Sequence, residues 1–98
     1  MKNGPHKLLT IVTESTIERV ILDDLESLGV RGYTVTDVRG KGVTGLRDAS
    51  IPLMSNIKIE IVEEAHLVDK ILKLLAKKYY KNYAIFVFVQ DVEVFSEE

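Results

Sequence analysis

In this 98-residue chain, the segment whose residue types are best suited to binding a ligand is a glycine-rich hexapeptide flanked by cations. It spans Gly40–Gly45 and matches the pattern G-x-G-x-x-G, in which backbone N–H groups can approach a phosphate closely. It does not fit a dinucleotide site, because that motif opens a helix, whereas Pro52 and sequence without helical periodicity follow here. It also misses the Walker sequence, because Leu46 and Arg47 stand where Lys and Ser or Thr are required. Arg39, Lys41 and Arg47 lie beside the glycines. The residues alone leave two interpretations open, a phosphate-binding loop and a flexible connection.

The other polar groups form no catalytic or metal-binding constellation. His66 and Asp69 lie one turn apart on a predicted helix, but two ligands without a third are more typical of a solvated helix face. The adjacent acids Asp23-Asp24 and Glu63-Glu64 are interpreted as ordinary surface charge. The chain contains no cysteine, which excludes disulfides, zinc–thiolate sites and thiol catalysis. We therefore predict a protein that is not an enzyme and has no metal site.

Charge and composition exclude two further classes of partner. Thirteen Lys and Arg against fifteen Asp and Glu give a net charge of −2, which excludes binding of nucleic acid by bulk charge. With 46% apolar and 29% charged residues, the chain is typical of one globular domain over residues 1–98. No apolar run approaches the roughly 18 residues of a membrane span, and the first residues lead into a strand rather than a signal peptide. We expect a cytoplasmic protein.

Hydrophobic periodicity predicts the elements that position these residues. Helical spacing runs from Ile17 to Leu28; Ser15 and Glu18 have capping-box spacing before it, and Gly29 ends it. No face is consistently apolar between residues 40 and 56. The order is strand, helix, strand, strand, helix, strand, with strands predicted over 8–12, 32–38, 57–61 and 83–94 and helices over 17–28 and 67–79.

This order predicts an α+β fold, the ferredoxin-like βαββαβ sandwich, in which two helices cover one face of an antiparallel sheet. A faint repeat supports it, since residues 9–14 and 59–64 each place an apolar strand and a Glu before a helix. The fourth strand of this fold lies at an edge, and residues 85–89 are apolar throughout. Such an edge needs cover, and a chain this short buries only about 60–65% of its unfolded surface. An oligomer is therefore favoured over a monomer whose own tail covers the strand.

Three segments of the chain resemble PII-type signalling proteins. Residues 32–42, GYTVTDVRGKG, resemble the second strand and the entry to the T-loop, the loop with which such proteins contact their partners. Residues 56–62, NIKIEIV, resemble the third strand, and residues 85–88, IFVF, the fourth. The resemblance covers nearly the whole chain in order. A shortened, flexible T-loop at about 41–55 and the turn at 79–83 are most similar to the SbtB-type branch, which is associated with bicarbonate transport and carboxysomes.

The resemblance implies a homotrimer that binds adenine nucleotides in clefts between subunits. It implies that Thr34 lies near the adenine, that Glu60 and Val62 line the cleft, and that Tyr83 and Ala84 of the neighbouring subunit close it. The glycine-rich loop then presents backbone groups and charge to the phosphates. With the flanking arginines, the predicted nucleotide-binding residues are Thr34, Arg39, Gly40, Lys41, Gly42, Arg47, Glu60, Val62, Tyr83 and Ala84.

The chain departs from the family pattern at three cations. PII proteins hold polyphosphate with a Lys in the B-loop, the turn before the fourth strand, and with two C-terminal Arg; Ala84, Phe95 and Glu97 stand at those places here. Because several charge-assisted bonds normally hold a triphosphate, we expect AMP, cAMP or ADP as ligand, with ATP left open. The predicted T-loop contains no tyrosine, which excludes uridylylation there.

The implied function is non-enzymatic signalling, in which the bound nucleotide sets the T-loop conformation. The T-loop then regulates a partner linked to bicarbonate transport or carbon fixation, either a membrane transporter or a carboxysomal protein. Docking on a transporter would recruit the protein to the inner face of the membrane. The alternative is a CutA-like metal-tolerance protein, or another ferredoxin-like trimer without a nucleotide site; the missing cysteines and isolated histidines count against metal. The sequence leaves open the partner, the preferred nucleotide, binding of bicarbonate or another small anion, and slow hydrolysis.

Overall fold

The computed structural model describes residues 2–40 and 55–96, with side chains over 5–40 and 55–95. The predicted order of elements is confirmed. In chain order they are β1 (Lys2–Glu14), the 3-10 turn η1 (Ser15–Ile17), α1 (Glu18–Ser27), β2 (Thr34–Val38), β3 (Asn56–Glu63), α2 (Ala65–Lys78) and β4 (Ile85–Ser96).

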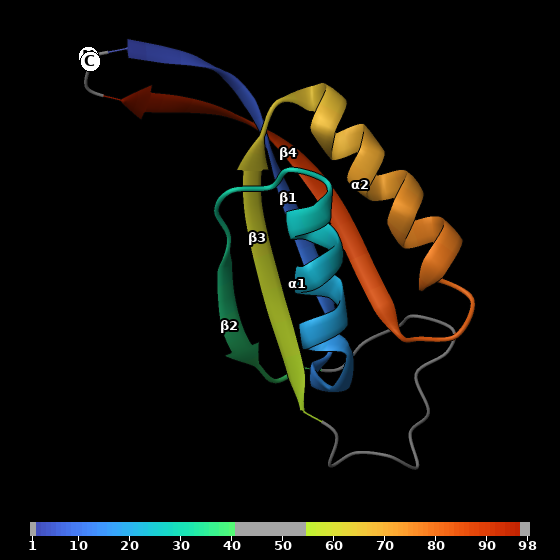
Figure 1. Ribbon diagram of the computed structural model, residues 1–98. Coiled ribbons are helices and arrows are strands. Elements are labelled where there is room, and N and C mark those ends of the chain that lie inside the picture. The colour runs from blue at the N-terminus through green and yellow to red at the C-terminus, as the bar shows by residue number, and fades with distance from the viewer. Residues whose placement is uncertain (1, 41–54, 97–98) are drawn as a thin grey trace.

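The strands form one antiparallel sheet in the order β2-β3-β1-β4. Both helices cover the same face of this sheet (Figure 1). The predicted ferredoxin-like α+β sandwich is therefore confirmed, with β1 and β3 central and β4 at an edge. The faint sequence repeat has a structural counterpart, because Glu14 and Glu64 each precede a helical turn that follows a central strand.

The hydrophobic core lies between the sheet and the two helices. The alternation predicted for residues 57–61 holds, since Ile57, Ile59 and Ile61 are all buried while Lys58 and Glu60 face the other side. Leu9 and Ile11 of β1 pair with this series in register. The buried cluster consists of Leu9, Ile11, Ile17, Ile21, Leu25, Val30, Ile57, Ile59, Ile61, Val68, Ile71, Leu75 and Tyr79.

Strand β1 is longer than the sequence pattern predicts, whereas β4 has the predicted length but begins and ends two residues later. They pair from Lys2↔Ser96 to Thr13↔Ile85, whereas β3 reaches along β1 only as far as Lys7↔Glu63. Their outer parts therefore form a two-stranded ribbon that projects from the sheet (Figure 1). The apolar pattern missed this part of β1 because residues 2–7 are mostly polar and become a strand only by pairing with β4.

The start of the first helix differs from the predicted capping box. Ser15 lies inside η1, and its hydroxyl is hydrogen-bonded to the Ser55 hydroxyl at 2.5 Å rather than to a free helix N–H. The Ser15 backbone N–H also donates to the Ser55 carbonyl at 3.0 Å. The local spacing predicts that the Ser15 hydroxyl caps the helix, but this hydroxyl is hydrogen-bonded to a residue 40 positions away in the sequence. At the other end Gly29 has a φ of +103°, which confirms the predicted left-handed position.

The face of the sheet away from the helices is not covered by any described part of the chain. On β4, Ile85 and Val87 pack against the core, whereas the alternate residues Phe86 and Phe88 are 50% and 40% exposed. Their rings lie 5.7 Å apart between centroids. We call this uncovered surface the open face; the described chain leaves an aromatic pair on it at the β4 edge.

Candidate functional site

The predicted adenine-side residues lie on the open face at the β2–β3 edge. Thr34 pairs with Glu60 directly across the two strands, so both side chains share one face of the sheet. Thr34 is exposed and Glu60 is half-buried. Val62 lies two residues further along β3 on the same face and is 44% exposed. The structure therefore brings Thr34, Glu60 and Val62 together, as the sequence predicts.

The predicted phosphate-side residues begin where β2 ends. Val38 pairs with Asn56 at the last rung of the sheet, and the exposed residues Arg39 and Gly40 follow. Among the described residues, a Cβ added to Gly40 would meet nothing within 4 Å. The other predicted members of this group, Lys41, Gly42 and Arg47, lie outside the described residues, as does the T-loop at 41–54.

Tyr83 and Ala84 lie in the turn between α2 and β4, at the opposite edge of the sheet. The antiparallel register places this turn at the same end of the sheet as Arg39 and Gly40. Strands β3 and β1 separate the two edges, which is three strand spacings, or about 14 Å. One chain therefore keeps the two groups of predicted site residues apart.

Hydrogen bonds from β1 hold Ala84 at both of its backbone groups. Its N–H donates to the Glu14 carboxylate at 2.9 Å, and its carbonyl accepts from the Thr13 hydroxyl at 2.8 Å. Thr13 has no exposed surface, so this bond also satisfies a buried hydroxyl. The Ala84 backbone is thereby fixed against the end of β1.

Two tyrosine–carboxylate contacts link helix α1 to the segments that carry the site residues. Tyr33, immediately before β2, donates to the Glu26 carboxylate at 3.1 Å, and this bond is the main cause of its raised pKa. Tyr79, at the end of α2, donates to the Asp24 carboxylate. Burial, with a smaller effect of Asp24, raises the pKa of Tyr79. Both phenols therefore keep their protons at neutral pH.

The sequence analysis missed the role of Asp24. Its carboxylate, whose side chain is 19% exposed, also accepts from Lys78 at 2.9 and 3.0 Å. Asp24 is therefore not ordinary surface charge. The signal for this contact is weak in sequence, because the two partners of Asp24 lie more than 50 residues away.

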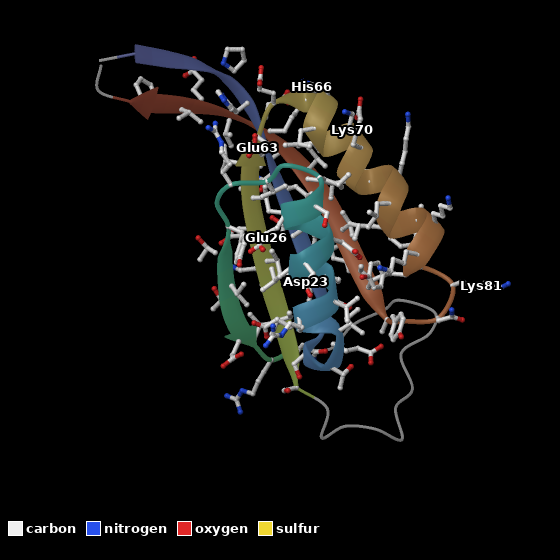
Figure 2. All side chains as sticks on the ribbon, viewed as in Figure 1. Asp23, Glu26, Glu63, His66, Lys70 and Lys81 are labelled. Carbon is white, nitrogen blue, oxygen red and sulfur yellow. The ribbon has the colours of Figure 1, made fainter. Side chains whose placement is uncertain are left out.

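The described residues contain no group of three or more His, Cys, Asp or Glu arranged to hold a metal ion. His66 and Asp69 are both exposed on α2. Within the same residues, no helix is long and apolar enough to cross a membrane. Figure 2 shows His66 and Lys70 on the outer side of α2, away from the sheet.

The arrangement is that of a ferredoxin-like domain whose predicted ligand groups are divided between two sheet edges. The family model of the nitrogen regulatory protein P-II matches residues 6–98. The chain belongs to this family.

Solved structures of similar proteins agree with this assignment. A PII-like signalling protein from Thermus thermophilus is 35% identical, with a TM-score of 0.80 over 96% of this chain and 93% of its own. CPII from Thiomonas intermedia, a nitrogen regulatory PII-like protein bound to ADP, AMP and bicarbonate, is 28% identical. Its TM-score is 0.82, over 99% of this chain and 100% of its own. CPII bound to ADP, AMP and acetate is 27% identical, with a TM-score of 0.84 over 98% and 94%.

The family assignment confirms the coarse part of the sequence-based interpretation. PII proteins are signalling proteins, generally without catalytic activity and typically trimeric. The alternative of a CutA-like metal-tolerance protein is not favoured.

Proposed function

We propose that this PII-like protein is a sensor of adenine nucleotides that binds them in clefts between the subunits of a homotrimer. The observation that supports the proposal is that the predicted site residues lie at two different edges of the sheet. Thr34, Glu60 and Val62 lie at one edge and Tyr83 and Ala84 at the other, with Arg39 and Gly40 at the same end as the turn. Two copies placed edge to edge would unite the groups in one cleft, which a single chain cannot do.

The open face supports the trimer. Phe86 and Phe88 are exposed there beside Leu8 and Val12, which are half-buried, and Thr10 lies among them. Exposed apolar area of this kind marks surfaces that pack against another chain. Three copies that bury these faces together would leave the polar β2–β3 edge of each copy available to a ligand.

The cations of the site favour a nucleotide with few phosphates. Ala84 offers the turn no charge, and Phe95 of β4 is an exposed aromatic where the family places an arginine. Arg39, directly before Gly40, is a described cation at this end of the sheet, and the proposed site adds Lys41 and Arg47 together with the Gly40 and Gly42 backbone. AMP, cAMP and ADP are therefore the proposed ligands. The nucleotides and the bicarbonate bound to CPII make bicarbonate a second candidate ligand.

The proposed output is regulation through the T-loop of about 41–55 within the single domain 1–98. The nucleotide would set the conformation of this loop, and the loop would dock on a membrane transporter or carboxysomal protein of the bicarbonate or carbon-fixation system. We place the chain in the SbtB-type branch because its short T-loop and its turn at 79–83 resemble those of that branch. The protein would work in the cytoplasm and at the inner face of the membrane when docked.

Calorimetric titration of the purified protein with AMP, cAMP, ADP and ATP tests the nucleotide proposal. We expect micromolar binding, about −8 kcal/mol, of at least one of the first three, without turnover, and ATP bound no more tightly than ADP. Much tighter binding of ATP would contradict the argument from the three missing cations. Absence of binding by every adenine nucleotide would refute the sensor.

A further inference from the structure

The turn between α2 and β4 is built around the backbone of Tyr79. The Tyr79 N–H donates to the Leu75 carbonyl at 2.9 Å, which closes the last turn of α2. The Tyr79 carbonyl then accepts from the N–H groups of both Asn82 and Tyr83, at 3.1 and 3.0 Å. The rings of Tyr79 and Tyr83 pack with centroids 5.9 Å apart. The position of Tyr79 therefore determines where the chain places Tyr83.

The side chain of Tyr79 is itself anchored on α1. The residue is 2% exposed, and its hydroxyl donates to the carboxylate of Asp24. The Lys78 ammonium bonds the same carboxylate, but its side chain is 48% exposed and the pair is solvent-screened. The hydroxyl bond is the more protected of the two contacts, and it joins two elements whose sequences are 55 residues apart.

We propose that Asp24 and Tyr79 are positioning residues that hold the α2–β4 turn so that Tyr83 and Ala84 can close the nucleotide site of the neighbouring subunit. The proposal rests on the proposed function. The turn has one support on its far side, the bonds from Thr13 and Glu14 to Ala84. The contact with Asp24 supplies the second support, on the near side. Without it, the turn would keep the bonds from β1 and those to the Tyr79 carbonyl, but Tyr79 would lose its anchor on α1.

Two variants separate the hydroxyl bond from the ion pair. Tyr79→Phe keeps the buried ring and the Lys78–Asp24 pair but removes the hydroxyl. Asp24→Asn removes the ion pair but keeps a side-chain oxygen that can accept from the hydroxyl. We expect Tyr79→Phe to weaken binding of ADP about fivefold, the fold-change of one net hydrogen bond. Asp24→Asn should bind ADP almost as tightly as the wild type, whereas Asp24→Ala should resemble Tyr79→Phe.

Two control variants distinguish the positioning role from the loss of any tyrosine hydroxyl and from a general loss of stability. Tyr80→Phe removes the hydroxyl of the next residue in the same turn, whose side chain is 44% exposed, and should leave ADP affinity unchanged. Ile71→Val destabilises α2 from the core side, away from the turn. If Ile71→Val weakens binding as much as Tyr79→Phe at a matched loss of melting temperature, the Asp24–Tyr79 contact acts only through stability, and the positioning role is refuted.

Hydrogen exchange of the turn provides a readout independent of the nucleotide. The amides of Asn82, Tyr83 and Ala84 should exchange faster in Tyr79→Phe than in Ile71→Val, because only the former loosens the turn locally. Unchanged exchange at these three amides would overturn the proposal. If wild type binds ADP and Tyr79→Phe binds it equally well, the positioning role fails while the sensor stands. If the wild type binds no adenine nucleotide, both the sensor and the positioning role fail.

Discussion

Tyr33 and Tyr79 both donate a hydroxyl hydrogen to a carboxylate of α1, yet the two contacts differ in burial. Tyr33 is 38% exposed, and Tyr79 is 2% exposed. Transfer of a charged phenolate into the environment of Tyr79 is costly, because it removes the charge from water and places it beside Asp24. Burial raises the pKa of Tyr79, so the protonation state of this phenol is coupled to folding.

This coupling predicts how stability depends on alkaline pH. In the unfolded chain a phenol ionises near its ordinary pKa of about 10, whereas burial raises the pKa of Tyr79 in the folded protein. The unfolded state therefore loses its proton first, and the stabilising effect is present below about pH 10 and is lost as the pH rises toward the folded pKa. Urea denaturation between pH 8 and 11 should show that wild type loses stability more steeply than Tyr79→Phe. Parallel losses in the two proteins would contradict the assignment.

At the residue scale, the sequence pattern and the family resemblance predict some of the proposed site residues but not the contacts that hold them in place. Thr34 and Glu60 are predicted on two strands, and the register pairs them across one rung. The surface-charge interpretation of Asp24 is wrong because its partners belong to a turn that the fold brings back onto α1. The capping interpretation of Ser15 is also wrong because of a distant partner, since the Ser15 hydroxyl is hydrogen-bonded to the hydroxyl of Ser55. Contacts between residues distant in sequence leave no periodic signal.

At the scale of elements, the sequence signals that hold are local ones. The alternation of Ile57, Ile59 and Ile61 and the glycine at position 29 each depend on a few neighbouring residues, and both predictions agree with the structure. The extension of β1 to Lys2 depends instead on a partner strand at the far end of the chain. Its length could not be predicted, because polar residues enter a strand there only through pairing.

The helix-ending glycine gives a prediction at this scale. Gly29 has a φ of +103°, a conformation that side chains with a Cβ rarely adopt, whereas Gly32 in the same connection has no such backbone requirement. A Cβ added at either position would meet no atom of the described residues within 4 Å, so steric clash with these residues does not distinguish the two glycines. Gly29→Ala should lower the free energy of unfolding by about 1–2 kcal/mol, and Gly32→Ala should have a much smaller effect. Equal losses in chemical denaturation would show that the φ of Gly29 is not the cause.

At the scale of the whole molecule, the open face divides into an apolar part at β1 and β4 and a more polar part at β2 and β3. This division agrees with the proposed use of the apolar part for assembly and of the more polar part for ligand binding. It also explains why the proposed site cannot be completed by one chain, since Tyr83 and Ala84 lie beside the apolar part and Thr34 beside the polar part.

Assembly through the open face predicts the effect of a charge placed there. Phe88→Lys should dissociate the trimer without unfolding the chain, because the side chain is already 40% exposed in the single subunit but would be buried between subunits. Ala76→Lys adds the same charge on an exposed position of α2 and should leave the trimer intact. Sedimentation analysis distinguishes the outcomes. A trimer that survives Phe88→Lys would remove the open face from the interface.

Hydrogen exchange with and without ADP tests most directly whether the nucleotide site is divided between two subunits, as proposed. One ADP per chain should protect amides in two segments at once, Thr34–Val38 with Arg39 and Gly40 at one sheet edge, and Tyr83 with Ala84 at the other. The Phe88→Lys monomer should show neither effect. Protection of one edge alone, or equal protection of both edges in the monomer, would contradict a site built between subunits.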